Sequence, residues 1–358
     1  MPNNLQLYHK VLHQIRQWLP AERVTRQRNM ALLVLGLVMS EAIHLSQIVS
    51  TWPVLGKNPS LANRLRRFLD NPRLDVATWY RPVAKQLLDA FANLRLRLVV
   101  DCTKVGFNHR LLVIGLAYRK RTLPLVWCVY EGSKGHVATA RQIALFQEVR
   151  RLIPRSAEVW VLGDAGFQHV PLLRWLRRRG WHFVIRQQGR ITVYRQGEGW
   201  CKINALALTQ GETRVIGWVR LTQEYNAGWY WLLLHWEEGE DDPWYLVSDQ
   251  ALSARCLLKH YRIRMWIEEM YGDMKGHGFD LEATHLADTD RISRLVLGVC
   301  LAFLWLICLG SWVVKRGFRH YIDRKDRRDK SYFRLGLDWL KRCWRLNQPV
   351  KLHFRPYP

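Results

Sequence analysis

Three carboxylates stand where they could act together. Asp101 and Asp164 each follow a short apolar run that predicts a β-strand, and Glu268 lies in a segment that predicts a helix. Carboxylates at the ends of adjacent strands can meet in space, and a helix can bring a third one to them. Taken alone, an aspartate after a strand is more commonly a turn residue or a helix cap.

Such a group of three carboxylates is a hard oxygen ligand set. It suits Mg²⁺ or Mn²⁺ and leaves coordination positions open for phosphate and water. Two such ions about 3.5–4 Å apart can activate a water or a 3′-hydroxyl and stabilise the leaving oxygen in phosphodiester cleavage or transfer.

The segment around Glu268 carries further polar side chains at helical spacing. On a helix of 3.6 residues per turn, Tyr261, Arg264, Glu268 and Lys275 fall within an arc of roughly 60°. Glu269 points about 100° away from that arc, which makes it the weaker candidate ligand. A stripe of this kind suggests a charged partner, although a solvated helix face gives the same spacing.

The composition indicates a folded protein with a polyanionic partner. The 358 residues include 55 Lys and Arg against 30 Asp and Glu, a net charge of +25, and 49% are apolar. A positive charge spread along a folded chain favours a nucleic acid or an anionic membrane surface as partner. The 18 tryptophans suit either core packing or stacking on bases.

Cysteine usage and the amino terminus favour a cytoplasmic protein. The seven cysteines are odd in number and form no C-x-x-C pair, which predicts free thiols in a reducing compartment. The first residues lack a basic segment followed by an apolar one, so no secretory signal is evident.

The elements that must position these residues divide the chain into three parts. Residues 1–94 predict a helical domain, with helices at 5–19, 27–49, 61–69 and 75–94, and with Ser60 and Asp75 as N-caps. Basic side chains make this domain a candidate DNA-binding module, with a plain packing domain as the alternative. They are Arg64, Arg66, Arg67 and Arg81.

Residues 95–290 predict an α/β domain. Three strands (95–100, 111–118 and 125–130) precede a helix at 138–152, a strand at 158–162, a helix at 171–179 and a strand at 181–186. This order implies a mixed sheet flanked by helices. Residues from about 187 to 249 are strand-like and aromatic-rich, which predicts a β-rich insertion before the helix that carries Glu268.

Residues 291–358 predict a C-terminal helical region. Its segment 295–314 holds twenty residues without a charge, enough to cross a bilayer or to form a helix buried on all sides. We expect the buried helix, because no other segment is comparable and the basic flanks give no orientation bias. The basic run 324–330 predicts a DNA-facing or dimer-facing segment, or else a solvated charge run.

These motifs together resemble the transposases of bacterial insertion sequences that carry an Asp-Asp-Glu triad on a ribonuclease-H-like fold. The resemblance is closest to insertion sequence family four, whose signature is Tyr-x2-Arg-x3-Glu-x6-Lys. The sequence has that signature without a gap at Tyr261, Arg264, Glu268 and Lys275. Asp101 with Thr103, and Asp164 with Gly166 and Phe167, look like the two aspartate blocks of the same group.

The resemblance implies roles for individual residues. Asp101, Asp164 and Glu268 would be catalytic and would bind two Mg²⁺ or Mn²⁺ ions. Some members of the family excise through a DNA hairpin and stack a flipped base on a Trp of the insertion. The residues implied to contact DNA are Tyr261, Arg264, Lys275 and, as the stacking ring, Trp244. Trp229, Trp231 and Trp236 are rivals of Trp244, and any one of them could instead be a core residue.

The resulting prediction is a Mg²⁺-dependent, cut-and-paste DNA transposase in the bacterial cytoplasm, associated with the nucleoid. It would bind double-stranded DNA, both the terminal inverted repeats of the element and the target, as a homodimer in the synaptic complex. The alternatives are a DNA-binding protein that has lost catalysis and a membrane protein built around 295–314.

Overall fold

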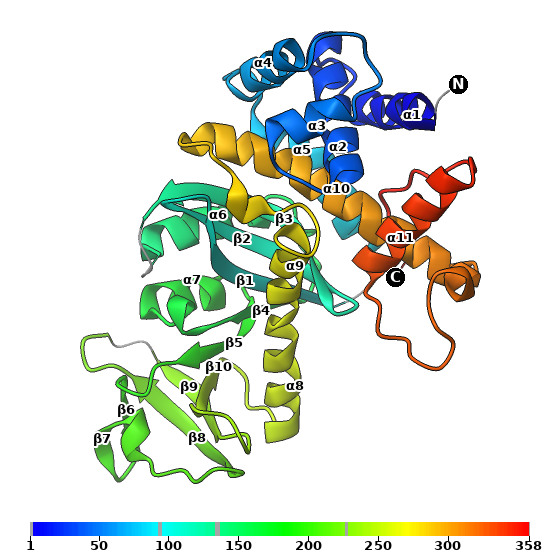
Figure 1. Cartoon of the computed structure of the whole chain (residues 1–358). Coiled ribbons are helices and arrows are strands. Elements are labelled where there is room, and N and C mark those ends of the chain that lie inside the picture. The colour runs from blue at the N-terminus through cyan, green and yellow to red at the C-terminus, as the bar shows by residue number, and fades with distance from the viewer. Residues whose placement is uncertain (1–2, 92–94, 133–136, 226–227, 358) are drawn as a thin grey trace.

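A ten-stranded mixed sheet forms the centre of the molecule in the computed structural model, which describes residues 3–91, 95–132, 137–225 and 228–357 (Figure 1). The strand order is β3-β2-β1-β4-β5-β10-β9-β8-β6-β7. β1 (Leu96–Val105), β2 (His109–Tyr118) and β3 (Arg121–Glu131) are antiparallel neighbours. β4 (Val159–Gly163) runs parallel to β1, and β5 (His182–Gln187) runs parallel to β4.

Helices cover both faces of this sheet. α6 (Thr139–Arg150) and α7 (Val170–Arg178) lie on one side, and α8 (Ala254–Arg264) and α9 (Trp266–Met274) lie on the other (Figure 1). The ring of His260 in α8 packs 4.5 Å from that of Trp160 in β4, centroid to centroid. The predicted α/β class is confirmed, and the arrangement of the first five strands is ribonuclease-H-like.

The aromatic-rich segment predicted as an insertion continues the same sheet. β10 (Trp244–Ser248) pairs antiparallel with β5, and β9 (Trp229–His235) pairs antiparallel with β10. β8 (Thr213–Leu221), β6 (Thr192–Arg195) and β7 (Gly199–Lys202) complete the order. The strand character of this segment was predictable, whereas its pairing with β5 depends on contacts between residues about 60 positions apart.

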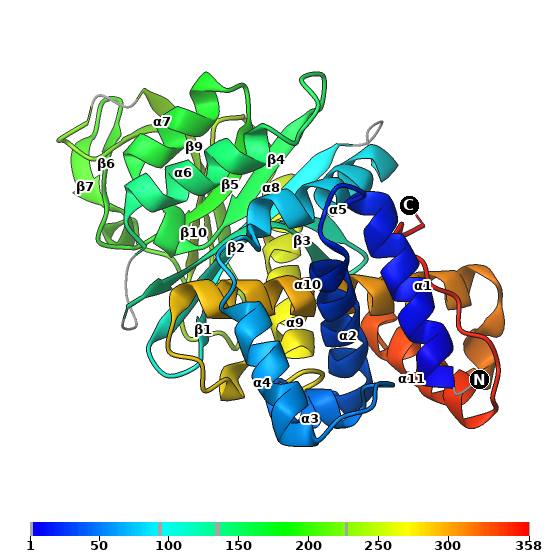
Figure 2. The ribbon, with the colours of Figure 1, turned by 90° about the horizontal axis from the view of Figure 1, so that it is seen from above.

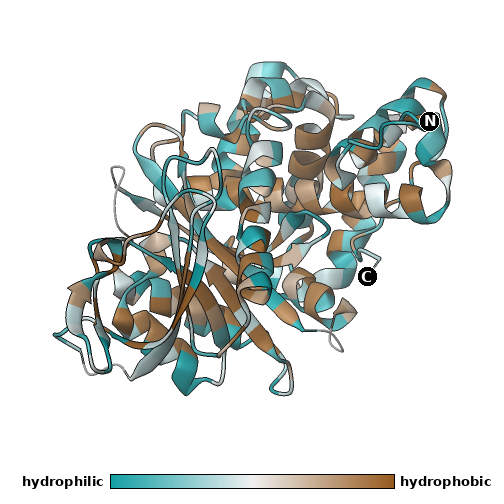
Figure 3. Ribbon diagram, turned by 90° about the horizontal axis from the view of Figure 1, so that it is seen from below, coloured by the Kyte–Doolittle hydropathy of each residue, from teal (hydrophilic) through white to brown (hydrophobic). Residues whose placement is uncertain are grey.

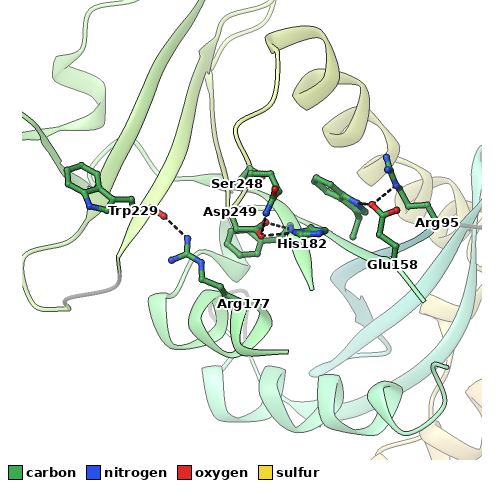
Figure 4. A network of polar contacts seen from close by, with 10 residues as sticks. Arg95, Glu158, Arg177, His182, Trp229, Ser248 and Asp249 are labelled. Carbon is green, nitrogen blue, oxygen red and sulfur yellow. Dashed lines mark hydrogen bonds and ion pairs between the residues drawn. The ribbon is translucent and has the colours of Figure 1, made fainter. Parts of the chain in front are cut away.

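A polar network fastens β10 to β5 at the edge of the sheet where β5 begins (Figure 4). The Asp249 carboxylate, which follows β10, accepts from the backbone N–H of Phe183 at 3.0 Å and lies 2.8 Å from Nδ1 of His182. Beside it, Glu158 pairs with Arg95 at 2.7 Å. We assign this network a structural role, because each of its charged groups is already used in joining one strand end to the next.

In the described residues 3–91, five helices precede the sheet: α1 (Asn3–Trp18), α2 (Val24–Ser40), α3 (Leu45–Ser50), α4 (Asn58–Leu69) and α5 (Val76–Ala90). The single helix predicted at 27–49 is wrong, because Glu41 takes the left-handed conformation (φ 50°) and ends α2. Ser60 is not an N-cap, since α4 begins at Asn58 after Lys57. Asp75 is the predicted N-cap, and its side chain accepts from the N–H of Thr78.

The apolar segment 295–314 lies within α10 (Thr289–Lys315), whose length and composition alone would allow it to cross a membrane. In the structure 94% of its most apolar window is buried, as predicted for a core helix. The N-terminal helices, α11 (Tyr332–Arg345) and β3 pack around it (Figure 2). Figure 3 shows the hydrophobic residues concentrated along these interior elements.

One hydrophobic cluster contains residues from the N-terminal helices, the sheet and α10. Hydrogen bonds and an ion pair reinforce the contact between α10 and the N-terminal helices: Arg294 of α10 donates to the backbone oxygens of Leu69 and Leu74, and Arg291 pairs with Asp70. The domain divisions at 94/95 and 290/291 stay predictions: residue 94 lies outside the described residues, and 290/291 falls within α10.

Candidate active site

The register of β1 and β4 brings the two aspartates together. The last paired residues of these parallel strands are Val100 and Gly163, and Asp101 and Asp164 are the residues that follow. Asp164 ends its strand as predicted. Asp101 does not, because β1 runs on to Val105 and Asp101 pairs with Val113 of β2.

Asp164 also serves as a local cap. Its Oδ1 accepts from the N–H of Gly166 at 2.9 Å, at the start of the short 3₁₀ turn Ala165–Phe167. Its Oδ2 lies on the side of Arg264, at 3.7 Å from Nη2. One oxygen of Asp164 therefore acts as a turn residue, as the alternative interpretation predicted. The other oxygen lies beside Arg264 and is available to the site.

The helix predicted to carry the whole Tyr261–Lys275 stripe is interrupted. α8 ends at Arg264, Met265 forms a turn, and α9 begins at Trp266. The N–H of Met265 bonds to the oxygen of Arg262, and the N–H of Glu268 bonds to the oxygen of Met265. Each of these hydrogen bonds joins residues three positions apart, as in a 3₁₀-helix, so the backbone is wound more tightly here than in an α-helix. Lys275 lies just beyond the end of α9, so the single-helix prediction is wrong at its middle and at its end.

Arg264 contacts all three predicted carboxylates. Its Nη2 lies 3.4 Å from Oδ2 of Asp101 and 3.7 Å from Oδ2 of Asp164, and its Nη1 donates to Oε1 of Glu268. Both Arg264 and Asp101 are buried, with 8% and 9% of their surfaces exposed. The fold therefore gathers three carboxylates around one positive charge at the centre of the sheet.

Burial and mutual repulsion set the electrostatics of this cluster. Burial raises the pKa of Asp101 to about 6, and the Asp164 and Glu268 charges add to that rise, while Arg264 opposes it. Burial tends to lower the pKa of Arg264, yet the three carboxylates outweigh it and leave that pKa above its ordinary value. Ionisation of Asp101 is thus unfavourable in this site, and a cation placed among the three carboxylates is stabilised.

The two adjacent glutamates have different partners. Glu268 joins the cluster through Arg264, whereas Oε2 of Glu269 lies 2.9 Å from Nη1 of Arg121, which also pairs with Asp273. The structure thus places Glu268 with the two aspartates and Glu269 outside the group.

The remaining signature residues lie close to the cluster, and their side chains contact other residues of the chain. Tyr261 is buried, 2% exposed, and its ring meets that of Trp244 edge-on at 4.9 Å. Nζ of Lys275 donates to Oγ1 of Thr103 at 2.8 Å and lies 3.2 Å from the carboxylate of Glu282. Contacts of Tyr261, Arg264, Lys275 and Trp244 with DNA stay predictions.

The rival tryptophans have their own contacts. Trp229 and Trp231 are partly buried on β9, and the indole N–H of Trp231 donates to the oxygen of Leu252 at 2.9 Å. The indole N–H of Trp236 donates to the oxygen of Glu240 at 2.8 Å. The structure does not single out one of these rings for stacking on a base.

Sequence reasoning missed Tyr271. Its hydroxyl donates to the backbone oxygen of Asp101 at 2.9 Å, fully buried, and so holds β1 against α9 beside the cluster. Its position three residues after Glu268, on the same helical face, is the signal that could have indicated it.

A hollow of about 770 Å³ opens beside Asp101 and Asp164. Basic and polar side chains share its lining with the two aspartates, which suits a phosphate-bearing ligand. They are Arg110, Gln168, His169, Gln188 and Arg190.

The donor set fits a hard divalent cation. Three carboxylates converge on one positive group, and oxygen donors of this kind are what Mg²⁺ and Mn²⁺ prefer. As the side chains stand, no three His, Cys, Asp or Glu among the described residues form a ready metal cage, and the guanidinium of Arg264 lies among the carboxylates instead. A bound ion would require this guanidinium to move.

Comparison with known proteins places the chain in a family. The family model described as "Transposase DDE domain" matches residues 102–305, more than half of the sequence. The chain is also similar to a piggyBac transposase, determined by cryo-EM as a synaptic complex with hairpin DNA. The likeness covers 98% of this chain and 83% of that one, at 11% identity and a TM-score of 0.43. Among curated proteins none matches. On the family match, this protein belongs to the transposase DDE domain family.

Proposed function

We propose that this protein is a cut-and-paste DNA transposase of insertion sequence family four, which cleaves at the ends of its element and joins the freed 3′-hydroxyl to target DNA. The observation that carries the proposal is the convergence of Asp101, Asp164 and Glu268 on Arg264. The uninterrupted Tyr-x2-Arg-x3-Glu-x6-Lys spacing supports the assignment to that family.

In this proposal Asp101, Asp164 and Glu268 hold the divalent ions, two Mg²⁺ or Mn²⁺. Bound there, the ions would supply Lewis-acid activation of a water or hydroxyl and charge stabilisation at the phosphate. Arg264 would leave the carboxylates and pair with a phosphate oxygen, for which its planar fork is suited. Lys275 adds a positive charge beside Thr103, at the edge of the same cluster.

Duplex DNA is the proposed partner, as both terminal inverted repeats and target, with two copies of the chain in the synaptic complex and the bacterial cytoplasm as location. The net charge of +25 supports a polyanionic ligand. The exposed basic side chains of α4, and those of the segment 324–330, are further candidates for contacts with the phosphate backbone.

The test is strand cleavage on a linear duplex that carries the inverted repeats flanking the gene. Wild type should nick the repeat ends only with Mg²⁺ or Mn²⁺ present, and Asp164→Asn should bind the duplex without cutting it. Metal-independent cutting, or full cutting by Asp164→Asn, would refute the proposed chemistry.

One observation favours a second candidate, a DNA-binding protein that has lost catalysis. Arg264 stands where a cation would bind, and a chain in which it cannot leave would bind DNA without cutting it. Retained repeat binding together with no cleavage in Mn²⁺ or Mg²⁺ by wild type would establish this alternative.

A further inference from the structure

The far strands of the sheet carry a row of aromatic side chains in register. Trp200 of β7 pairs with Tyr194 of β6, Tyr194 pairs with Arg220 of β8, and Arg220 pairs with Trp229 of β9. Residues directly opposite one another in a sheet point to the same face. Three rings and one guanidinium therefore lie side by side across four strands.

A second row lies beside the first. Trp218 and Trp231 are paired across β8 and β9, two residues along from Arg220 and Trp229, so they share the same face. Their ring centroids are 5.4 Å apart. We refer to the two rows together as the aromatic ladder: Trp200, Tyr194, Arg220, Trp229, Trp218 and Trp231.

The rings of the ladder contact one another at tilted angles and so form one continuous aromatic surface. The centroid of Tyr194 lies 5.5 Å from that of Trp200 and 6.3 Å from that of Trp229. The guanidinium carbon of Arg220 lies 4.8 Å from the Trp229 centroid and 5.9 Å from that of Tyr194. Arg220 thus links the rings through cation–π contacts.

The two faces of these strands differ sharply in exposure. On the opposite face Val193, Val219, Leu221 and Tyr230 are each 0% exposed. On the ladder face Trp200 is 39% exposed and Trp218 is 44% exposed, and Arg220 is exposed as well. Exposing large aromatic rings to water is unfavourable in free energy, and clusters of exposed rings mark binding surfaces.

The charge on these strands indicates what binds. The sequences of β6, β7, β8 and β9 contain no acidic residue. Lys202 and Arg220 lie on the ladder face, whereas Arg195 and Arg214 lie on the opposite face and pair with Glu198 and Glu212. Stacking rings with interleaved cations fit unpaired nucleic acid, because every base offers a π-face and every phosphate a negative charge. A duplex hides the faces of its bases, so it cannot use the rings in this way.

We propose that the aromatic ladder binds an unpaired stretch of DNA, with bases on the exposed rings and phosphates on the neighbouring basic side chains. The surface is separate from the carboxylate cluster, and its function does not depend on strand cleavage there. It would hold single-stranded DNA without marked preference for sequence, since stacking tolerates any base.

Fluorescence anisotropy with the full chain tests the proposal. The probes are a labelled oligothymidine of about 20 nucleotides, long enough for a stacking surface, and a duplex of the same length, both in a buffer with a chelator. The double variant Trp200→Ala/Trp218→Ala should lose roughly tenfold or more in affinity for the single strand, because it removes the two most exposed rings on which bases would stack. Its affinity for the duplex should be unchanged.

The matched control is Trp200→Phe/Trp218→Phe, which keeps a ring at each position and should retain most of the single-strand affinity. Arg220→Ala should weaken binding and reduce its salt dependence by about one ion. Thermal unfolding reports whether each variant is folded, and the single variant Trp218→Ala replaces the double one if that fails to fold.

Three results would overturn the proposal. The first is unchanged single-strand affinity in the folded Ala variants, and the second is an equal loss of affinity for single strand and duplex. The third is a sedimentation coefficient that differs between the unliganded Ala variant and the unliganded wild type, while oligonucleotide binding is unchanged. The last result would identify the face as an interface between copies of the chain. None of these results bears on cleavage at the repeat ends.

Discussion

The guanidinium of Arg264 lies 3.4 Å from the carboxylate of Asp101, although the two residues are separated by more than 160 positions in the sequence. The same guanidinium reaches Asp164 and Glu268. A cluster of three carboxylates, of which Asp101 is buried and Asp164 and Glu268 are partly exposed, is unfavourable without a cation, and Arg264 supplies that cation from the chain itself. A divalent ion at this place would compete with Arg264.

Substitution of Arg264 by Gln should therefore raise the affinity of the protein for Mn²⁺. A unit charge about 4 Å away is worth roughly 1–4 kcal/mol at effective dielectric constants of 80 to 20, so we expect an increase of at least about fivefold. Calorimetric titration of the DNA-free protein with Mn²⁺ measures it. Unchanged affinity would show that Arg264 and the ion do not share a place.

The same substitution should lower stability without metal by about 1–2 kcal/mol, because buried Asp101 loses its partner while solvent screens the partly exposed Asp164 and Glu268. Mn²⁺ should restore the loss, which denaturation with and without the ion will show. Arg121→Gln is the matched control, because Arg121 pairs with Asp273 and Glu269 outside the cluster. It should destabilise the protein without any rescue by Mn²⁺.

Asp101 should make stability depend on pH between its unfolded and folded pKa values. The pKa is about 6 in the folded protein, above the ordinary value of 3.8, so the folded state binds more protons in this interval. Its contribution to the free energy of unfolding is fully present below about pH 4 and is lost as the pH rises through 6. Urea denaturation without divalent ions at pH 4 to 7 measures this effect.

The matched variant is Asp101→Asn, which cannot ionise. The difference in unfolding free energy between wild type and this variant should change by about 2–3 kcal/mol across the interval, since one pKa unit corresponds to about 1.4 kcal/mol. A difference that stays constant with pH would mean that Asp101 titrates at its ordinary pKa.

The sequence predicts local features of this fold well and long-range ones poorly. Alternating and apolar runs locate β1 to β5, and the residue after β4 is Asp164, as expected. The pairing of β10 with β5 cannot be predicted from the local sequence, because an aromatic-rich strand can pair with any open edge of a sheet. The long apolar α10 could be recognised as a helix, but only its packing shows where it is buried.

The candidate site shows the same division. The types and order of Asp101, Asp164 and Glu268 follow from the sequence, and the β1–β4 register brings the first two together. The break at Met265 could not be predicted, because helical periodicity continues through it. Arg264 still pairs with Glu268 across the break, and its contacts with Asp101 and Asp164 depend on the packing of α8 on the sheet, which helical spacing alone does not show.

Glu268 and Glu269 offer a paired test of the proposed ligand set. Glu268→Gln should reduce repeat-end cleavage by at least about 100-fold, since preorganised charge at a reacting phosphate is worth roughly 10²–10³ in rate. Glu269→Gln should cleave close to the wild-type rate, because Glu269 pairs with Arg121 and not with Arg264. Gel assays of nicked repeat duplex compare the two, and an equal loss in both would remove Glu268 from its proposed role.

The crossing of α10 and α11 should be intolerant of any side chain at Gly310. A Cβ built there would lie 1.9 Å from the backbone oxygen of Tyr332, and one at Gly336 would lie 2.0 Å from that of Leu306. Since both obstacles are backbone, the helices must separate, and Gly310→Ala should cost about 1–3 kcal/mol or more of unfolding free energy. Gly276→Ala is the control, since its Cβ would meet nothing within 4 Å. Urea denaturation that shows equal stability for the two variants would mean that α10 and α11 are not held in contact.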